Sequence, residues 1–439
     1  MEKLLTETLS TPVEDAGDLV VVGAGSTGVA AALSAARLGL RTTLIDPASH
    51  AGGTLVSGIP ILGYHDGKRQ VVAGIADEIV RELNRHGGTV DDPAQTTAIN
   101  VDVERLKFVL LNLLEEAGVK LRLHTLVAGV RTEEGRITHV IVEGKGGRRA
   151  LAARWFIDAT GDADIAMAAG VPIEKGRKSD GKMQPMTLMF GIGGIDKKAF
   201  QEWGGYHRMT ELWKGMSEKF RNPRKQDFAH FWGPDSRSGE WAFNATRVLA
   251  ADGSDSVSLS AAEAEGRRQV FEMIDAFLKP HVPGFENAFV SWTAPKIGVR
   301  ETRRIVGTYT LTRDDIWNFV SFDDAICHGS YPIDVHSPTG SDTEFPHDHF
   351  YGGRHWSIPY RSLVPLDVRN LLVGGRCLSS EHEALAAVRV MANTMATGEA
   401  AGTAIALAQK AGIDPADLDP QVLRSQLRAQ GAWLPEVNS

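Results

Sequence analysis

The first strong pattern in the chain is a run of apolar residues, followed by glycines and then by an alanine-rich stretch. Residues 18–22 read Asp-Leu-Val-Val-Val, a short continuous apolar run of the kind that forms a buried parallel strand. Residues 29–38 have the composition of a helix and are followed by Gly39, a favourable helix C-cap, after which residues 40–46 return to a strand pattern. We therefore expect a complete strand–helix–strand unit over residues 18–46.

Two helices and several short strands are expected next. Helical patterns cover residues 71–85 and 103–117, and Asp102 is a favourable N-cap for the second helix. Short apolar stretches joined by Glu-Gly and Gly-Gly turns predict strands at residues 119–127, 129–132, 137–143 and 149–158. We expect these strands to form a small β-meander that leads into residues 159–162.

The pattern changes between residues 170 and 361. Most of the nine tryptophans lie here and no strand–helix–strand pattern recurs, which indicates an inserted antiparallel domain with helices, one of them over residues 261–278. Residues 370–376 repeat the strand-then-glycine pattern, and a long helix is expected over residues 383–411. The predicted division is an N-terminal extension (1–17), a discontinuous dinucleotide-binding domain (18–170 and 362–439) and a substrate or cap domain (171–361).

The residues Gly23-Ala-Gly25-Ser-Thr-Gly28 stand where a strand ends and a helix begins, which is the context that a dinucleotide-binding fingerprint requires. Gly23 permits the tight turn, Gly25 removes a side chain that would block a pyrophosphate, and Gly28 lets helix and strand pack closely. The free N–H groups of the helix N-terminus attract phosphate. Asp46 ends the second strand, where a carboxylate can accept a hydrogen bond from a ribose hydroxyl. The alternative is a glycine-rich turn that binds nothing.

Composition narrows the classes of function. A chain of 439 residues exceeds one compact core, and its net charge of −8 argues against nucleic acid as the main partner. The two cysteines, Cys327 and Cys377, form no CxxC pair, which excludes a cysteine zinc site and an iron–sulfur cluster. The N-terminus lacks an apolar segment and the last long helix contains Arg389 and Glu399, so neither a signal peptide nor a membrane span is expected, and the expected location is the cytoplasm.

Further segments distinguish FAD from NAD as the dinucleotide. Gly52-Gly53, residues 159–164 and residues 373–376 stand where flavoproteins with two dinucleotide-binding domains contact FAD. The chain resembles the FAD-dependent oxidoreductase family, a relative of the fumarate reductase and succinate dehydrogenase flavoproteins. The motifs that carry the resemblance are GGTLVSGIPILGYHDGKRQVVAGI (52–75), MQPMTLMF (183–190), APKIGVRETRRIVG (294–307), YPIDVHSPTG (331–340), IPYRSLVP (358–365) and EHEALAAVRVM (381–391).

The resemblance implies an α/β fold in which a Rossmann-like FAD-binding domain of the glutathione-reductase type, with a β-meander, carries an inserted α+β substrate domain. It also implies that the last long helix directs its N-terminus at the flavin pyrimidine ring, where a positive helix end stabilises the charge of reduced flavin. The alternative for this segment is an ordinary alanine-rich core helix. The residues expected to contact FAD are Gly23, Gly25, Ser26, Thr27, Gly28, Asp46, Pro47, Gly52, Gly53, Thr54, Ser57, Gly58, Val127, Ala159, Thr160, Gly161, Asp162, Gly375, Arg376, Met391 and Ala392.

The residues expected to bind substrate or to handle a proton are His382, Arg300, His336, His65 and Arg389. Arg300, with Arg303 and Arg304 beside it, suits the bidentate recognition of a carboxylate or a phosphate, although surface ion pairs with Glu301 and its neighbours are the alternative. Each histidine has the alternative of a structural role. His328, His336, His347, His349 and His355 have no spacing typical of zinc ligands, so no metal is expected.

The expected reaction is hydride transfer between FAD and a small polar organic substrate, with an external electron acceptor or donor. Because the chain has a single dinucleotide fingerprint, a separate NAD(P)H domain is not expected. One alternative is reduction of an activated C=C bond, as in fumarate reductases; another, of a different class, is an electron-transfer flavoprotein subunit. A homo-oligomer is possible. His50 precedes the glycine pair, but its register does not match the histidine that tethers FAD in fumarate reductase relatives, so non-covalent FAD is expected.

Overall fold

The computed structural model describes residues 5–233, 239–340, 343–344 and 347–435. Its centre is a five-stranded parallel sheet with the order β21-β10-β2-β3-β6. The strands are β21 (Leu371–Val373), β10 (Trp155–Asp158), β2 (Leu19–Val22), β3 (Thr42–Ile45) and β6 (Lys120–Arg122). The predicted unit over residues 18–46 is confirmed, with helix α1 (Ser26–Arg37) between β2 and β3.

Alternate residues of the central strands belong to two different apolar cores. Leu19, Val21 and Ile157 pack with the helices α1, α2 (Ile75–Arg85), α3 (Val103–Glu116) and α12 (Met391–Ala411). Val20 and Phe156 point to the other side, against a four-stranded sheet with the order β1-β9-β8-β7. This second sheet is built from β1 (Val13–Asp15), β9 (Arg149–Ala152), β8 (Arg136–Glu143) and β7 (Leu126–Glu133). The domain therefore has three layers: helices, parallel sheet and β-meander.

The strand boundaries around the meander differ from the sequence expectation. Residues 119–127 do not form one meander strand, because β6 pairs with β3 in the central sheet and β7 begins only at Leu126. Residues 149–158 likewise divide into β9, in the meander, and β10, in the central sheet. Apolar runs alone do not distinguish a strand of one sheet from a strand of the next when the two follow each other closely.

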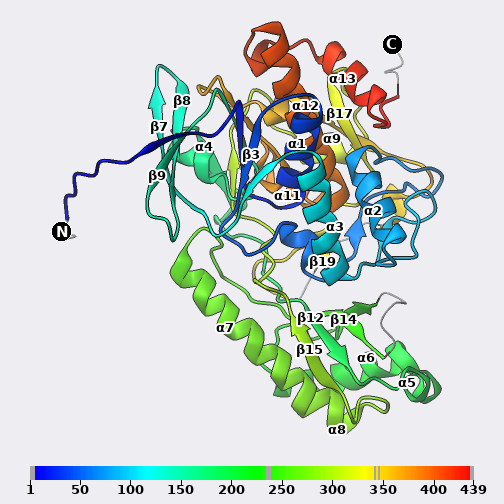
Figure 1. Cartoon of the computed structure of the whole chain (residues 1–439). Helices are drawn as coiled ribbons and strands as arrows, with labels where there is room; N and C mark the ends of the chain where they lie inside the picture. The colour runs from blue at the N-terminus through cyan, green and yellow to red at the C-terminus, as the bar shows by residue number, and fades with distance from the viewer. Residues whose placement is uncertain (1–4, 234–238, 341–342, 345–346, 436–439) are drawn as a thin grey trace.

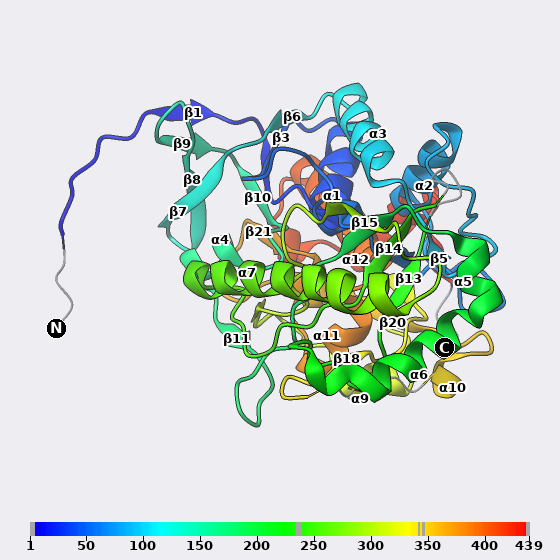
Figure 2. The ribbon, with the colours of Figure 1, turned by 90° about the horizontal axis from the view of Figure 1, so that it is seen from below.

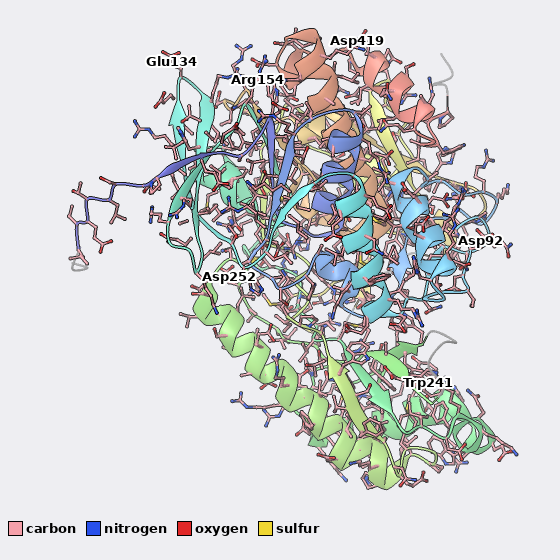
Figure 3. The ribbon with its side chains drawn as sticks, viewed as in Figure 1. Asp92, Glu134, Arg154, Trp241, Asp252 and Asp419 are labelled. Atoms are coloured by element: carbon pink, nitrogen blue, oxygen red, sulfur yellow. The ribbon has the colours of Figure 1, made fainter. Side chains whose placement is uncertain are left out.

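Within the inserted segment, residues 186–297 form a cap with their own apolar core (Figures 1 and 2). Residues 311–360 instead contribute to the core around α1 and α12. The antiparallel sheet of the cap has the order β13-β14-β12-β15. These strands are β13 (His230–Trp232), β14 (Trp241–Asn244), β12 (Phe190–Gly193) and β15 (Phe289–Thr293), and the cap helices are α5 (Lys197–Trp203), α6 (Gly205–Met216), α7 (Ser256–Glu272) and α8 (Lys279–His281). Figure 2 shows α7 running along the cap, and a π-helical turn over Met273–Leu278 joins it to α8. Near the start of α7, Asp252 pairs with Lys175 at the end of strand β11 (Ile173–Lys175), while Trp241 lies within the cap (Figure 3).

The helix expected over residues 383–411 is two helices, α11 (His382–Val388) and α12. The chain leaves the helical conformation at Val390, which has φ −66° and ψ 146° and is the N-cap of α12. The side chain of Arg389, just before this break, bonds to Asp334. The break between the two helices therefore coincides with a tertiary contact between Arg389 and Asp334. An alanine-rich sequence pattern does not reveal such a contact.

The remaining elements are short. Paired strands are β4 (Ile61–Leu62) with β5 (Ala98–Ile99), β11 (Ile173–Lys175) with β16 (Arg303–Ile305), β17 (Ala325–Gly329) with β20 (Trp356–Pro359), and β18 (Val335–His336) with β19 (Thr343–Glu344). The other α-helices are α4 (Asp164–Ala168), α9 (Arg313–Trp317), α10 (His347–Phe350) and α13 (Pro420–Ala429). Among the described helices, none has the length and apolar character needed to cross a membrane.

Candidate functional site

The glycine loop between β2 and α1 lies directly against the chain that follows β10. A Cβ atom on Gly23 would come 2.5 Å from the carbonyl oxygen of Ala159, and a Cβ on Gly28 would come 1.7 Å from the carbonyl oxygen of Gly23. Around Gly25, by contrast, no heavy atom of the described residues other than those of its chain neighbours lies within 4 Å of the position that a Cβ would take. Gly23 and Gly28 are thus required for packing, whereas Gly25 leaves open space beside backbone at a helix N-terminus, where a phosphate can approach.

Asp46 holds its carboxylate beside this loop. Its Oδ2 accepts a hydrogen bond from the backbone N–H of Ala24 at 2.7 Å, and its Oδ1 accepts one from Ala48 at 2.8 Å. The glycine pair follows closely, since a Cβ on Gly53 would lie 2.8 Å from the Cα of Gly25. A carboxylate has lone pairs beyond these two bonds, so Asp46 retains acceptor capacity for a ribose hydroxyl.

The C-terminal segment reaches the same loop. A Cβ on Gly375 would come 2.2 Å from Thr27 Oγ1, and a Cβ on Gly398 would come 2.1 Å from the carbonyl oxygen of Thr27. The hydroxyls of Ser26 and Thr394 are hydrogen-bonded at 2.7 Å. The first turns of α1 and α12 therefore lie side by side, although they are far apart in sequence.

Arg376 joins three segments. Its Nε donates to the carbonyl oxygen of Gly161 at 2.8 Å, its Nη2 pairs with Asp162 Oδ1 at 2.7 Å, and its Nη1 donates to the carbonyl oxygen of Val299. The preceding turn is organised by buried Asp158, which accepts hydrogen bonds from Ile165 and other backbone N–H groups. Burial raises the pKa of Asp158 to about 6. The segments around residues 23–28, 52–53, 159–162 and 375–398 thus converge on one side of the sheet.

Comparison with known proteins decides the family. A model of the FAD dependent oxidoreductase family matches residues 18–427. The chain belongs to this family. FAD is accordingly its cofactor, and the residues of the site fit it: Gly25 leaves room for the pyrophosphate and Asp46 retains acceptors for the ribose.

Individual proteins resemble this chain only over part of its length or at low sequence identity. Thiamine thiazole synthase of Metallosphaera sedula is 31% identical over 163 residues, which cover 35% of this chain and 57% of that protein. This chain thus matches little more than half the length of that relative. Among solved structures, p-nitrophenol 4-monooxygenase of Pseudomonas putida has a TM-score of 0.49 and 13% identity, with 94% of this chain and 84% of that chain covered. A geranylgeranyl bacteriochlorophyll reductase-like protein of Thermoplasma acidophilum has a TM-score of 0.47 and 13% identity, with 96% and 83% covered.

The structure brings His336 and Arg389 into contact with Asp334, and the charge of Arg300 acts on the same carboxylate. Arg389 Nη2 donates to the backbone oxygen of Asp334 at 3.1 Å and to its Oδ2 at 3.3 Å, and His336 Nε2 lies 3.2 Å from the same Oδ2. Gln184 completes the group, because its side-chain oxygen accepts from the backbone N–H of His336 at 3.2 Å. We call these five residues the arginine cluster.

Burial and neighbouring charges shift the pKa values of three residues in the arginine cluster. Burial, together with the charge of Arg389, lowers the pKa of Arg300 to about 9. Burial and the charge of Arg300 lower the pKa of His336 to about 3, so its imidazole is neutral at neutral pH. Burial also opposes ionisation of Asp334, but the hydrogen bond with His336 and the charges of His336, Arg389 and Arg300 more than offset this, so the pKa of Asp334 lies well below the usual range.

Two of the five predicted catalytic residues lie outside this cluster. His382 is buried, with Nδ1 2.8 Å from Glu301 Oε2, and Glu301 also pairs with Arg304. His65 accepts a hydrogen bond from the N–H of Gly67 at 3.0 Å, and its carbonyl oxygen accepts one from Ser330 at 2.9 Å. Within the described residues, no hydrogen bond or ion pair joins either histidine to the arginine cluster.

Other residues predicted to contact FAD lie on several different elements. Thr54 belongs to a 3₁₀ turn over Gly53–Val56, Ser57 donates to the carbonyl oxygen of Thr54, and Val127 lies on β7, paired with Val142. Met391 and Ala392 are the first residues of α12. The sequence interpretation overlooked Asp334 and Gln184, although both stand within motifs that carry the family resemblance. In the described part of the chain, no group of His, Cys, Asp and Glu is arranged to hold a metal ion.

Proposed function

We propose that the protein transfers a hydride between FAD and a small polar organic substrate held between the FAD domain and the cap, with an external electron acceptor or donor completing the cycle. The observation that carries the proposal is that the cap packs against the segments expected to bind FAD. Bound FAD supplies the redox chemistry. The chain supplies binding, orientation and the exclusion of water.

Trp292 of β15 packs directly against Gly58 of the FAD domain. A Cβ on Gly58 would lie 2.1 Å from Trp292 Cη2, and a Cβ on Gly191 of β12 would lie 2.2 Å from Trp292 Nε1. The indole is thus fixed between the two domains, and its Nε1 donates to Glu240 at 2.7 Å. Gly58 belongs to the segment expected to contact FAD. Strand β15 of the cap therefore lies beside the expected cofactor site.

Within this arrangement, we assign substrate binding to Arg300 and Arg389 and proton handling to His336. The positive N-terminal end of α12 stabilises negative charge that develops nearby. Arg389 lies immediately before this helix, which places the arginine cluster at the same end. We assign His382 and His65 a positioning role, because His382 pairs with Glu301 and His65 bonds to Gly67 and Ser330.

Anaerobic absorbance spectroscopy tests the proposal. Bleaching of the oxidised flavin by hydroxy- or amino-substituted organic acids supports hydride transfer to FAD. Reoxidation of reduced protein by α,β-unsaturated acids supports the second candidate, reduction of an activated C=C bond, which the arginine cluster favours because such substrates carry a carboxylate. If no small molecule changes the flavin spectrum while an electron-transfer protein co-purifies, an electron-transfer subunit replaces both.

We also propose that FAD is bound without a covalent link. His50 is engaged locally, with Nδ1 3.1 Å from the carbonyl oxygen of Ala51. Acid precipitation should release the flavin into the supernatant, and flavin that remains with the precipitate contradicts this proposal.

A further inference from the structure

The arginine cluster carries positive charge that the described residues do not neutralise. Arg300 donates only from Nη1, to the carbonyl oxygen of Pro185 at 2.6 Å and to Thr187 Oγ1 at 2.8 Å. Neither acceptor is charged, and Arg300 forms no ion pair with a carboxylate of the described chain. Asp334 is the single carboxylate shared by the cluster, and Arg389 already occupies it.

Charges on the neighbouring elements do not change this balance. Arg224 and Arg247 of the cap have the same sign as Arg300 and act on it through space. Arg224 is paired with Asp227, and Arg247 donates to the carbonyl oxygen of Ser337 at 3.3 Å. With His336 neutral, Arg300 and Arg389 face one negative charge, Asp334, so the cluster itself retains one positive charge.

Two buried donors of the same group have no hydrogen-bond partner among the residues that the structure describes. Gln184 is 1% exposed, and its Nε2 makes no hydrogen bond although its Oε1 is held by the N–H of His336. The Nε of Arg389 is also buried without a partner. A buried donor without an acceptor is costly, so these two donors favour an acceptor that binds beside them.

We propose that the arginine cluster binds a carboxylate group of the substrate, an assignment of substrate class that rests on the proposed function. A guanidinium group forms two parallel charge-assisted bonds to a carboxylate, and Arg300 supplies that fork. Gln184 and Arg389 supply further donors. One carboxylate neutralises the one remaining positive charge, which favours a single carboxylate at this position over a phosphate dianion.

The position of the cluster gives this binding a role in the reaction. Arg389 and Val390 form the short break before α12, and the side chain of Val390 packs beside Gly63, whose Cβ would lie 2.9 Å from Val390 Cγ2. Arg389, which bonds to Asp334, therefore holds the arginine cluster close to the first turn of α12, and a carboxylate bound by the cluster is anchored at this end of the helix. Anchoring one end of a small substrate fixes the approach of its reacting carbon to the cofactor.

Binding to the oxidised holoenzyme tests the proposal without any turnover. Flavin difference spectra and calorimetry are recorded with propionate and benzoate, with propionamide and benzamide as neutral analogues, and with inorganic phosphate. We expect the carboxylates to bind at least tenfold more tightly than the amides and than phosphate. Arg300→Gln should weaken carboxylate binding roughly 10- to 100-fold, and Arg300→Lys, which keeps the charge but not the fork, should lie between the two.

Arg303→Gln is the matched control, because Arg303 stands in the same motif but pairs with Asp164 at 2.5 Å. It should leave carboxylate affinity unchanged. The flavin content of each variant shows that it is folded. Equal binding of acids and amides to the wild type, or equal losses in Arg300→Gln and Arg303→Gln, overturns the carboxylate site.

The two proposals fail in different ways. Carboxylate binding that depends on Arg300, in a protein whose flavin no organic acid reduces or reoxidises, supports the site and contradicts the proposed function. Bleaching of the flavin by uncharged substrates alone, with no carboxylate binding, supports hydride transfer and contradicts the carboxylate site.

Discussion

At the scale of single residues, the most informative groups are buried polar side chains whose partners come from distant segments. Glu399 is one example. It lies within α12, is 2% exposed, and accepts a hydrogen bond from the N–H of Ile75 at the start of α2 at 2.9 Å. Burial raises the pKa of Glu399 from 4.5 to about 7.

This shift predicts a stability that falls with rising pH. Because the folded protein favours the protonated carboxyl, the contribution of Glu399 is fully present below about pH 4.5 and is lost as the pH rises through 7. Glu399→Gln, which stays neutral and keeps an acceptor for Ile75, should be more stable than the wild type at pH 8 by on the order of 1–3 kcal/mol. Thermal unfolding from pH 5 to 8 measures this difference. Parallel curves for the two proteins contradict it.

The residue scale also shows where sequence reasoning ends. The glycines of the loop could be predicted because turn, phosphate approach and close packing impose local requirements on residues 23–28. Asp334 and Gln184 could not be assigned a role in this way. Asp334 bonds to Arg389 from the break before α12, and Gln184 accepts from the backbone N–H of His336. Both pairings join segments that are distant in sequence. For His382 the opposite holds: the sequence suggested a catalytic role, but the structure pairs His382 with Glu301 in a buried network that also includes Arg304.

At the scale of elements, the packing of α1 against α12 positions the cofactor segments. Gly398 and Gly402 face the backbone of α1, and a Cβ on Gly402 would lie 2.3 Å from the carbonyl oxygen of Ala31. The hydroxyls of Ser34 and Thr403 add a buried hydrogen bond at 2.7 Å. Small residues in α12 therefore serve close approach of two helices, which an alanine-rich composition indicates only in general terms.

Gly398→Ala should separate these helices. The added methyl would lie 2.1 Å from the carbonyl oxygen of Thr27, a contact that backbone cannot relieve without moving α1. We expect a loss of about 3 kcal/mol in the free energy of unfolding and a lower FAD content. Gly215→Ala in α6, where no atom lies within 4 Å, is the control and should be neutral or slightly stabilising. Chemical denaturation and the flavin-to-protein ratio measure both effects, and equal behaviour of the two variants speaks against this packing.

The sequence predicted the order of helices and strands better than it predicted which sheet each strand joins. The strand–helix–strand unit, the Asp102 cap of α3 and the final strand β21 follow local patterns, and Asp102 accepts hydrogen bonds from Glu104 and Arg105 as expected. The assignment of β6 and β10 to the central sheet depends on pairing between distant strands. Pairing of that kind has no periodic signature in the sequence.

At the scale of the whole molecule, Trp292 connects the cap with the FAD domain. Trp292→Ala should destabilise this junction by on the order of 2 kcal/mol, because a partly buried indole is lost, and should raise flavin fluorescence by removing a nearby aromatic ring. Phe289→Ala, on the same strand with a side chain 56% exposed, should change neither property. Thermal unfolding and flavin fluorescence of the purified proteins provide the comparison. Unchanged fluorescence in Trp292→Ala would place the indole away from the cofactor.

The central claim is that one extended FAD joins the glycine loop, the turn after β10 and the start of α12, with the cap and the arginine cluster facing its reactive ring. A crystal structure of the purified holoenzyme tests this claim most directly. It should show the pyrophosphate at Gly25, the ribose at Asp46, and the flavin ring between Gly58 and the first turn of α12, with Arg300 on the substrate side. A flavin ring bound elsewhere, or separated from Arg300 by the body of the cap, would contradict the account.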